Sequence, residues 1–383
     1  MAFGDVVKEI RQSTKDPIAD GIECVVGLEH IEPECIHLRN WASIDEATTF
    51  TKTFQKGHIL FGRRRAYLKK AARTEFDGIC SGDITVMESK DGLIPELLPF
   101  LICNDKFFDY AVKHSAGGLS PRTKFKDLAN YEFFLPPKDQ QTNLAELFWA
   151  SDRSCEENQR LARRIERHIQ SLFKHANFVK STTLDPHFGK LRSKHPVAKA
   201  GDHITQLQYG ISESLTESEG IPVLRMNNLQ NGVLDLRDLK YFPASPEDLE
   251  DVILNKGDVL FNRTNSFDLV GKVSLFDVEG TYTFASYLIR IKTDERTLDP
   301  RYLNFFFNTE LGKAKIRRYR TPGVSQSNIN AQNIRQIRIP LPPISEQRSL
   351  MDKVDSEQAL LETAVQAVQN AKQLQKSLIN QIF

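Results

Sequence analysis

The chain has 383 residues and a formal net charge of +1, because 51 basic side chains are balanced by 50 acidic ones. This balance excludes a strong overall attraction to nucleic acid, so any such contact must come from local basic patches. Apolar residues make up 40% of the chain, and no apolar run approaches the ~18 residues that a membrane-spanning helix needs. The length suits two domains with separate cores.

Five cysteines are present, an odd number without the paired spacing of a metal site or a disulfide framework: Cys24, Cys35, Cys80, Cys103 and Cys155. We therefore predict reduced, mostly buried thiols and no metal site. The first residues lack the charged-then-apolar profile of a secretion signal, so we expect a cytoplasmic protein.

The first 142 residues alternate short apolar runs with turn residues, as mixed strands and short helices do. A strand is predicted at 25–28, and apolar residues spaced by three and four indicate one or two helices over 93–114. A last strand is predicted at 131–135. Pro136 and Pro137 stop it, because consecutive prolines neither donate to a ladder nor continue a helix. A long helix with a polar middle is then predicted over 143–173.

The second half repeats the first. Lys56-Gly57-His58-Ile59-Leu60-Phe61-Gly62-Arg63 returns 200 positions later as Lys256-Gly257-Asp258-Val259-Leu260-Phe261-Asn262-Arg263. Three further blocks keep the same order at nearly the same offset, including Leu-Pro-Pro before each long helical pattern. Four colinear blocks indicate an internal duplication.

The last helical pattern carries an apolar seam at alternating spacings of four and three, which is typical of a coiled coil. We predict that a partner helix packs against this seam, which contains Leu350, Val354, Leu361, Val368 and Leu378. At ~1.5 Å per residue each long helix extends about 45 to 55 Å. The predicted fold is α+β, with two similar domains and two long helices in a pseudo-twofold repeat. The expected boundaries are 1–142, 143–178, 179–343 and 344–383.

The junction between the second domain and the last helix carries a specific resemblance. Gly323-Val324-Ser325-Gln326-Ser327-Asn328-Ile329-Asn330, followed by Ile339-Pro340-Leu341-Pro342-Pro343-Ile344-Ser345-Glu346-Gln347, resembles the junction in specificity subunits of type I restriction-modification systems. The first half is a weaker copy, with Lys138-Asp139-Gln140-Gln141 before its helix. The resemblance covers essentially the whole chain.

The resemblance implies a non-catalytic protein with two target-recognition domains, each reading one half of a bipartite site in double-stranded DNA. The long helices would be antiparallel spacers that set the gap between the half-sites, and two methyltransferase subunits would bind them, with the seam residues as partner contacts. Restriction subunits would join through the methyltransferase subunits. S-adenosylmethionine and ATP are expected on the partner subunits and no cofactor on this chain.

Two other functions stay open: a specificity subunit of a related composite type II restriction enzyme, and an assembly scaffold that does not bind DNA. The sequence contains no adenine-methylation loop and no phosphate-binding Gly-rich loop. Asp77, Glu88 and Lys90 imitate the spacing of some metal-dependent nucleases. Chance is the better explanation, since no further converging ligands accompany them.

The densest basic cluster directly follows the repeated strand. We predict DNA contacts for Arg63, Arg64, Arg65, Tyr67 and Lys69 in the first half and for Arg263 and Asn265 in the second. Arginine binds guanine O6 and N7 through two hydrogen bonds, and asparagine binds adenine N6 and N7 in the same way. A solvated strand end is the alternative interpretation.

Further basic residues surround the matching loops of both halves. Predicted phosphate contacts are Arg122 and Lys124 in the first half and Lys315, Arg317 and Arg318 in the second. Phosphate contacts position a protein on DNA without specifying sequence. Ser325 and Asn328, in the second loop itself, are also predicted DNA contacts. A run of charge is often only a solvated face, so that alternative stays open here too.

Overall fold

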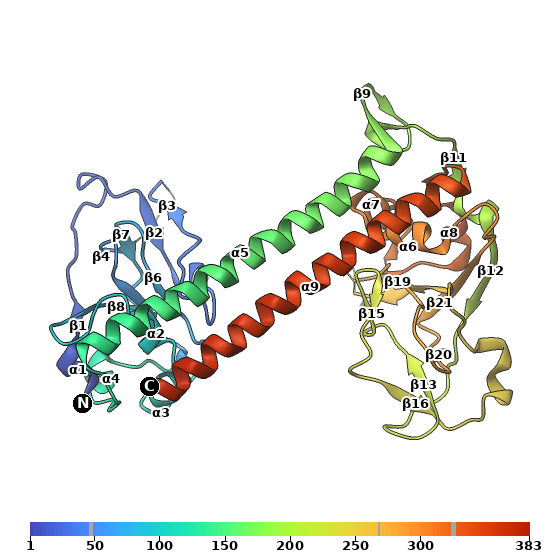
Figure 1. The fold of residues 1–383 in the computed structure, drawn as a ribbon. Coiled ribbons are helices and arrows are strands. Elements are labelled where there is room, and N and C mark those ends of the chain that lie inside the picture. The colour runs from blue at the N-terminus through green and yellow to red at the C-terminus, as the bar shows by residue number, and fades with distance from the viewer. Residues whose placement is uncertain (46–48, 267–268, 323–326) are drawn as a thin grey trace. The chain divides into compact units, whose positions relative to one another are not determined.

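The computed structural model describes residues 1–45, 49–266, 269–322 and 327–383 (Figure 1). It divides into two compact units, the first made of Met1–Ala162 with Thr363–Phe383 and the second of Arg163–Glu362. The divisions fall inside the two long helices, α5 (Lys138–Asn177) and α9 (Ile344–Ile382). The predicted domain boundaries lie near the helix ends instead, and that division stays a prediction.

The first unit contains two four-stranded sheets, with strand orders β1-β8-β5-β6 and β3-β2-β7-β4. Strands β2 and β7 pair in parallel, and the other strand pairs of these two sheets, within the described residues, are antiparallel. The strands are β1 Val7–Ile10, β2 Cys24–Val26, β3 Ala42–Ser43, β4 Lys52–Phe54, β5 Ile59–Gly62, β6 Ala71–Arg73, β7 Gly78–Cys80 and β8 Ile84–Ser89. The short helices are α1 Phe3–Val6, η1 Leu28–His30, η2 Ala66–Leu68, α2 Leu98–Ile102, α3 Asp105–Lys113 and α4 Phe125–Leu128.

The second unit repeats this arrangement. Its main sheet has the order β12-β21-β17-β19, and a three-stranded sheet has the order β16-β13-β20 with β13 and β20 parallel. The strands are β9 Phe178–Asp185, β10 Gly189–Ser193, β11 Val197–Lys199, β12 Ile204–Tyr209, β13 Ile221–Leu224, β14 Leu229–Gln230, β15 Val233–Leu234, β16 Lys240–Phe242, β17 Val259–Asn262, β18 Thr264–Asn265, β19 Val273–Leu275, β20 Thr283–Phe284, β21 Leu288–Thr293, β22 Thr321–Pro322, β23 Ser327–Asn328 and β24 Arg338–Pro340. The helices are η3 Ala200–His203, η4 Glu247–Val252, α6 Pro300–Asn308, α7 Glu310–Arg318 and α8 Ala331–Gln336.

The repeated strand has the same burial in both units. All four residues of β5 and all four of β17 are buried. Successive side chains of a strand point to opposite faces of the sheet, so Phe61 packs in one apolar cluster of the first unit and Leu60 in another. Phe261 and Leu260 divide between two clusters of the second unit in the same way. The predicted duplication and the α+β fold are confirmed.

The turn before each repeated strand also matches. Gly57 and Gly257 have φ of +92° and +91°, a region that glycine enters without the steric cost of a Cβ. His58 Nδ1 accepts the backbone N–H of Gln55 at 3.0 Å, and Asp258 Oδ2 accepts that of Asn255 at 2.9 Å. Two different side chains therefore close the same turn.

The long helices run antiparallel in each unit. In the first unit Gln375 donates to the Phe148 carbonyl at 3.3 Å, while Cys155 is close enough to Lys372 for that charge to act on its thiol. In the second unit Ile169 and Phe173 share a buried cluster with Leu350 and Val354. Residue numbers rise along one helix as they fall along the other, so the predicted antiparallel spacer helices are confirmed.

Each long helix is fixed to its unit by one buried glutamine near its start. Gln141 donates to the carbonyls of Gly92 and Pro136 at 2.8 and 2.9 Å and accepts Ile94 N–H at 3.1 Å. Gln347 donates to Thr297 and Pro342 at 2.9 and 2.8 Å and accepts Asp299 N–H at 3.0 Å. The two sets differ only by the repeat offset, so both helices begin in the same geometry.

Two differences from the predicted elements remain. The strand predicted at 131–135 is extended chain that forms only the isolated bridge between Ala2 and Glu132, because no neighbouring strand continues the pairing. The first long helix starts at Lys138, five residues earlier than predicted. Within the described ranges, no helix is long and apolar enough to cross a membrane.

Candidate nucleic-acid interface

In the first unit, the end of the repeated strand lies against the loop that follows α3. Thr123 N–H donates to the Arg63 carbonyl at 2.9 Å, and Arg65 N–H donates to the Pro121 carbonyl at 2.9 Å. Arg64 and Arg122 form an isolated bridge. Arg63, Arg64, Arg65 and Arg122, predicted separately from two sequence blocks, are therefore neighbours.

A single carboxylate organises two of these arginines. Asp83 accepts Arg122 Nε at 2.7 Å and Arg64 Nη1 at 3.4 Å, and Arg64 Nη2 also donates to Ser120 Oγ at 3.1 Å. The hydrogen bond from Arg122, followed by the contribution of Arg64, holds the pKa of Asp83 below its ordinary value. Within the described residues, the buried Nε atoms of Arg63 and Arg64 both lack a hydrogen-bond partner.

The other residues of the first unit that are predicted to contact DNA differ in exposure and in ion pairing. Tyr67 is 55% exposed, and Lys124 is exposed at the start of α4. Lys69 Nζ lies 2.6 Å from Asp105 and 3.6 Å from Glu34, so a DNA phosphate would compete with two carboxylates for it. The prediction for Lys69 remains untested.

The second unit builds the same junction. Ile329 N–H donates to the Arg263 carbonyl at 2.9 Å, matching the bond from Thr123 to Arg63. Strand β18 pairs with β23, so Asn265 lies opposite Ser327 and Thr264 opposite Asn328. The structure thus brings Arg263, Asn265 and Asn328 together, while Ser325 lies outside the described residues.

Arg263 is held by an aromatic ring instead of a carboxylate. Its Cζ lies 4.9 Å from the ring centroid of Tyr209, and its Nη1 donates to the Ser286 carbonyl at 3.3 Å. Tyr209 is 43% exposed. Sequence reasoning missed both Tyr209 and Asp83. A signal existed for Tyr209, because this aromatic residue ends an alternating strand pattern directly before Gly210.

The basic residues of α7 do not form one surface. Lys315 is only 7% exposed. Its ammonium donates to the His187 carbonyl and lies 4.7 Å from the Phe188 ring centroid. Burial lowers its pKa, and its place in the structure is that of a packing residue. Arg317 and Arg318 are exposed, with Arg317 3.9 Å from Glu310.

The nuclease-like acidic residues have structural partners. Asp77 accepts Lys56 N–H at 2.7 Å, and Glu88 lies 2.9 Å from Lys8. Among the described residues, no group of three or more His, Cys, Asp or Glu side chains is arranged to hold a metal ion.

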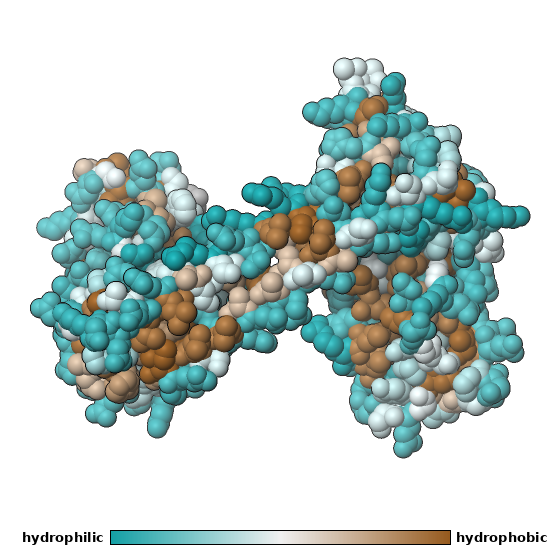
Figure 2. All heavy atoms as spheres, viewed as in Figure 1, coloured by the Kyte–Doolittle hydropathy of each residue, from teal (hydrophilic) through white to brown (hydrophobic). Residues whose placement is uncertain are grey.

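The apolar seam predicted to contact partner subunits lies largely inside the chain itself. Leu350 and Val354 belong to the core of the second unit, with Leu361 packed against it, and Leu378 packs against the core of the first. Val368 is half-buried. Figure 2 shows hydrophobic atoms at the surface over the long helices, and the large apolar side chains exposed there are Leu147, Leu161, Leu360, Val365 and Leu374.

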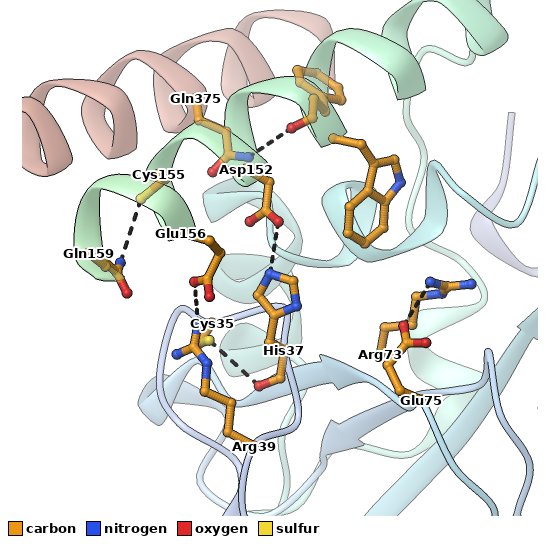
Figure 3. A network of polar contacts seen from close by, with 12 residues as sticks. Cys35, His37, Arg39, Arg73, Glu75, Asp152, Cys155, Glu156, Gln159 and Gln375 are labelled. Carbon is orange, nitrogen blue, oxygen red and sulfur yellow. Dashed lines mark hydrogen bonds and ion pairs between the residues drawn. The ribbon is translucent and has the colours of Figure 1, made fainter. Parts of the chain in front are cut away.

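A polar network joins a loop of the first unit to α5 (Figure 3). His37 Nε2 lies 2.8 Å from Asp152, and Arg39 pairs with Glu156 one helical turn further along. The hydrogen bond to Asp152 is the main cause that raises the pKa of His37. These contacts tie the loop to the helix.

Comparisons with known proteins agree with this architecture. Residues 208–368 match the type I restriction modification DNA specificity domain. The EcoKI specificity subunit of Escherichia coli is 28% identical over 172 residues, which are 44% of this chain and 37% of that protein. The chain spans about half or less of the length of this and other curated relatives that it matches.

Two solved structures share the fold over the whole chain. The specificity subunit of a type I restriction-modification system from M. genitalium has a TM-score of 0.57 at 12% identity, covering 100% of this chain and 95% of that one. A chain from a study of complex assembly in the type I R-M system has a TM-score of 0.56 at 18% identity, covering 100% and 96%. Residues 208–368 thus match the type I restriction modification DNA specificity domain, and the whole chain shares its fold with solved structures from type I restriction-modification systems.

Proposed function

We propose that this chain is the DNA-specificity subunit of a type I restriction-modification complex. Each domain reads one half of a bipartite site in double-stranded DNA, and the long helices set the gap between the two halves. The chain positions the reaction and carries no catalytic group of its own.

One observation carries this proposal: the same strand-end junction is built twice. Arg63 and Arg263 each follow a fully buried strand, and the carbonyl of each accepts an N–H from the loop after the short helices. A rigid strand end beside a basic loop suits contact with base edges and phosphates. A repeated junction with different flanking side chains suits a site whose halves differ in sequence.

The partners follow from the same assignment. We propose that two methyltransferase subunits dock on the exposed apolar residues of α5 and α9, which the chain's own core leaves uncovered. Restriction subunits join through them. S-adenosylmethionine and ATP bind to these partner subunits, and the complex works in the cytoplasm, where its DNA lies.

Methylation mapping tests the proposal. Cells that express the chain with its neighbouring methyltransferase are compared with cells that express the methyltransferase alone. We expect a bipartite methylated motif only when the chain is present, and the motif names both half-sites.

The alternatives give different results. A stable complex without any motif indicates an assembly scaffold, and the DNA assignment is then withdrawn. Cleavage at or near the motif by a single methyltransferase-nuclease partner indicates the composite type II system. Metal-dependent cleavage by the purified chain alone contradicts a non-catalytic role.

A further inference from the structure

The reading arginine of the second unit has one nitrogen left for a ligand. Arg263 Nη1 donates to the Ser286 carbonyl at 3.3 Å, and Nε is buried without a partner. Nη2 forms no hydrogen bond with the described residues, yet it is not one of their buried atoms. Nη2 is therefore not fully buried, and Arg263 as a whole is half-buried.

The Tyr209 ring fixes the plane of this group. The ring centroid lies 4.9 Å from Arg263 Cζ, within the range in which the π face attracts a guanidinium. Tyr209 is the last residue of β12, and its register partner is Ile289 in the central strand β21. The tyrosine hydroxyl also lies 3.4 Å from Ala331 N. A rigid element thus carries the ring.

Among the described residues of the first unit, no aromatic ring supports Arg63 in this way. Phe61 pairs with Thr85 as Phe261 pairs with Ile289, so the register assigns Arg11 to the place of Tyr209. Arg11 pairs with Glu9 at 2.7 Å. Tyr209 belongs to the second recognition site alone.

We propose that Tyr209 is a positioning residue for the second half-site: its ring and the Ser286 carbonyl hold Arg263 so that the free edge of the guanidinium meets a base edge, most favourably the O6 and N7 of guanine. This inference rests on the proposed function. A guanidinium held in one plane loses less side-chain entropy when it binds, which favours its two-bond contact over a general attraction to phosphate.

The test measures methylation in cells that contain the full chain and its methyltransferase, at sites with single-base changes in either half. Arg263→Ala first defines which half-site the second unit reads. For Tyr209→Ala we expect discrimination in that half-site to fall about fivefold, as the loss of a partly exposed cation–π contact allows. Discrimination in the other half-site stays unchanged.

Two variants separate positioning from packing. Tyr209→Phe retains the ring and is expected to restore discrimination, whereas Tyr209→Leu fills similar space without a π face and is expected to fail. Leu184→Ala, at a 77% exposed position of the same unit, is the matched control. Unfolding midpoints in urea are measured for all variants, and Tyr209→Leu replaces Tyr209→Ala if the latter is destabilised.

A double mutant tests whether Tyr209 acts through Arg263. If Tyr209 acts through Arg263, adding Tyr209→Ala to Arg263→Ala has no further effect, because coupled residues are not additive. Unchanged discrimination in Tyr209→Ala, failure of Tyr209→Phe to rescue, or full additivity overturns the inference. Loss of the bipartite motif in the wild-type experiment instead overturns the proposed function, so the two failures are distinguishable.

Discussion

The two recognition junctions share a backbone and differ in chemistry. In the first unit, Arg63 N–H donates to the Asp83 carbonyl, and in the second Arg263 N–H donates to that of Tyr287, both at 3.0 Å. At this position the first unit has Asp83, whose carboxylate pairs with Arg64 and Arg122. The second unit has Tyr287, which is 49% exposed. The shared main-chain hydrogen bonds hold the strand end in place. The side chains differ, so each junction offers different chemical groups to a ligand.

Under the proposed function, this difference is what duplication of a DNA-reading module requires. Main-chain hydrogen bonds do not depend on side-chain identity, so β5 and β17 keep their surroundings while Asp83, Tyr209 and Arg11 diverge. Two modules with identical side chains would read identical half-sites. The comparison therefore separates residues that build the junction from residues that give it a preference.

The largest expected effect concerns the buried glutamines that both units share at the start of their long helices. Gln141→Leu and Gln347→Leu each remove an amide that satisfies three backbone groups. We expect each to cost about 3 kcal/mol of unfolding free energy, because buried donors and acceptors lose their partners. Urea denaturation measures the loss, with the exposed Gln140→Leu as control. A clearly smaller cost at one site means that the anchors are not equivalent.

Next in size is the effect of the reading arginines. Arg63→Ala and Arg263→Ala are each expected to lower discrimination by about 1–3 kcal/mol, or roughly 5- to 150-fold, in one half-site only. Methylation of single-base variants of the motif measures it. Equal loss in both half-sites from either variant contradicts the division of reading between the two units.

A smaller effect is expected at the carboxylate of the first junction. Asp83→Asn removes the charge that orients Arg64 and Arg122, so we expect a loss of roughly fivefold in the first half-site, typical of a weakened charge-assisted contact. Tyr287→Phe at the corresponding place is the control in the second unit. If Asp83→Asn lowers discrimination in the second half-site instead, the two junctions do not serve separate half-sites.

The smallest effect concerns pH. Asp152 raises the pKa of His37 above 6.5, so the stabilisation is fully present below pH 6.5 and is lost as the pH rises through the raised value. We expect less than about 1 kcal/mol from this partly exposed pair. Protection factors, which are exchange rates corrected for the intrinsic base-catalysed rate, should fall with rising pH at residues 35–39 and along the first half of α5, and His37→Gln should remove this fall. An unchanged trend in His37→Gln assigns it to another group.

Several features of this protein follow from the sequence alone. Repetition of a block fixes the number of units, because equal patterns of burial and turn residues form equal strands. Helical periodicity placed α9 to within a few residues. Arginines directly after a buried strand were recognisable for the same reason, since a strand end exposes the next side chains.

The tertiary structure decided which side chains support these arginines and which charges are available. Asp83 lies 19 residues from Arg64 and 39 from Arg122. Tyr209 ends β12, whereas Arg263 follows β17. Such neighbours are set by strand register and loop closure, which local patterns do not specify. Lys315 looked like part of a basic surface, yet helix packing buries it against His187 and Phe188. Leu350 and Val354 likewise join the chain's own core, because an apolar seam specifies burial and not the partner that provides it.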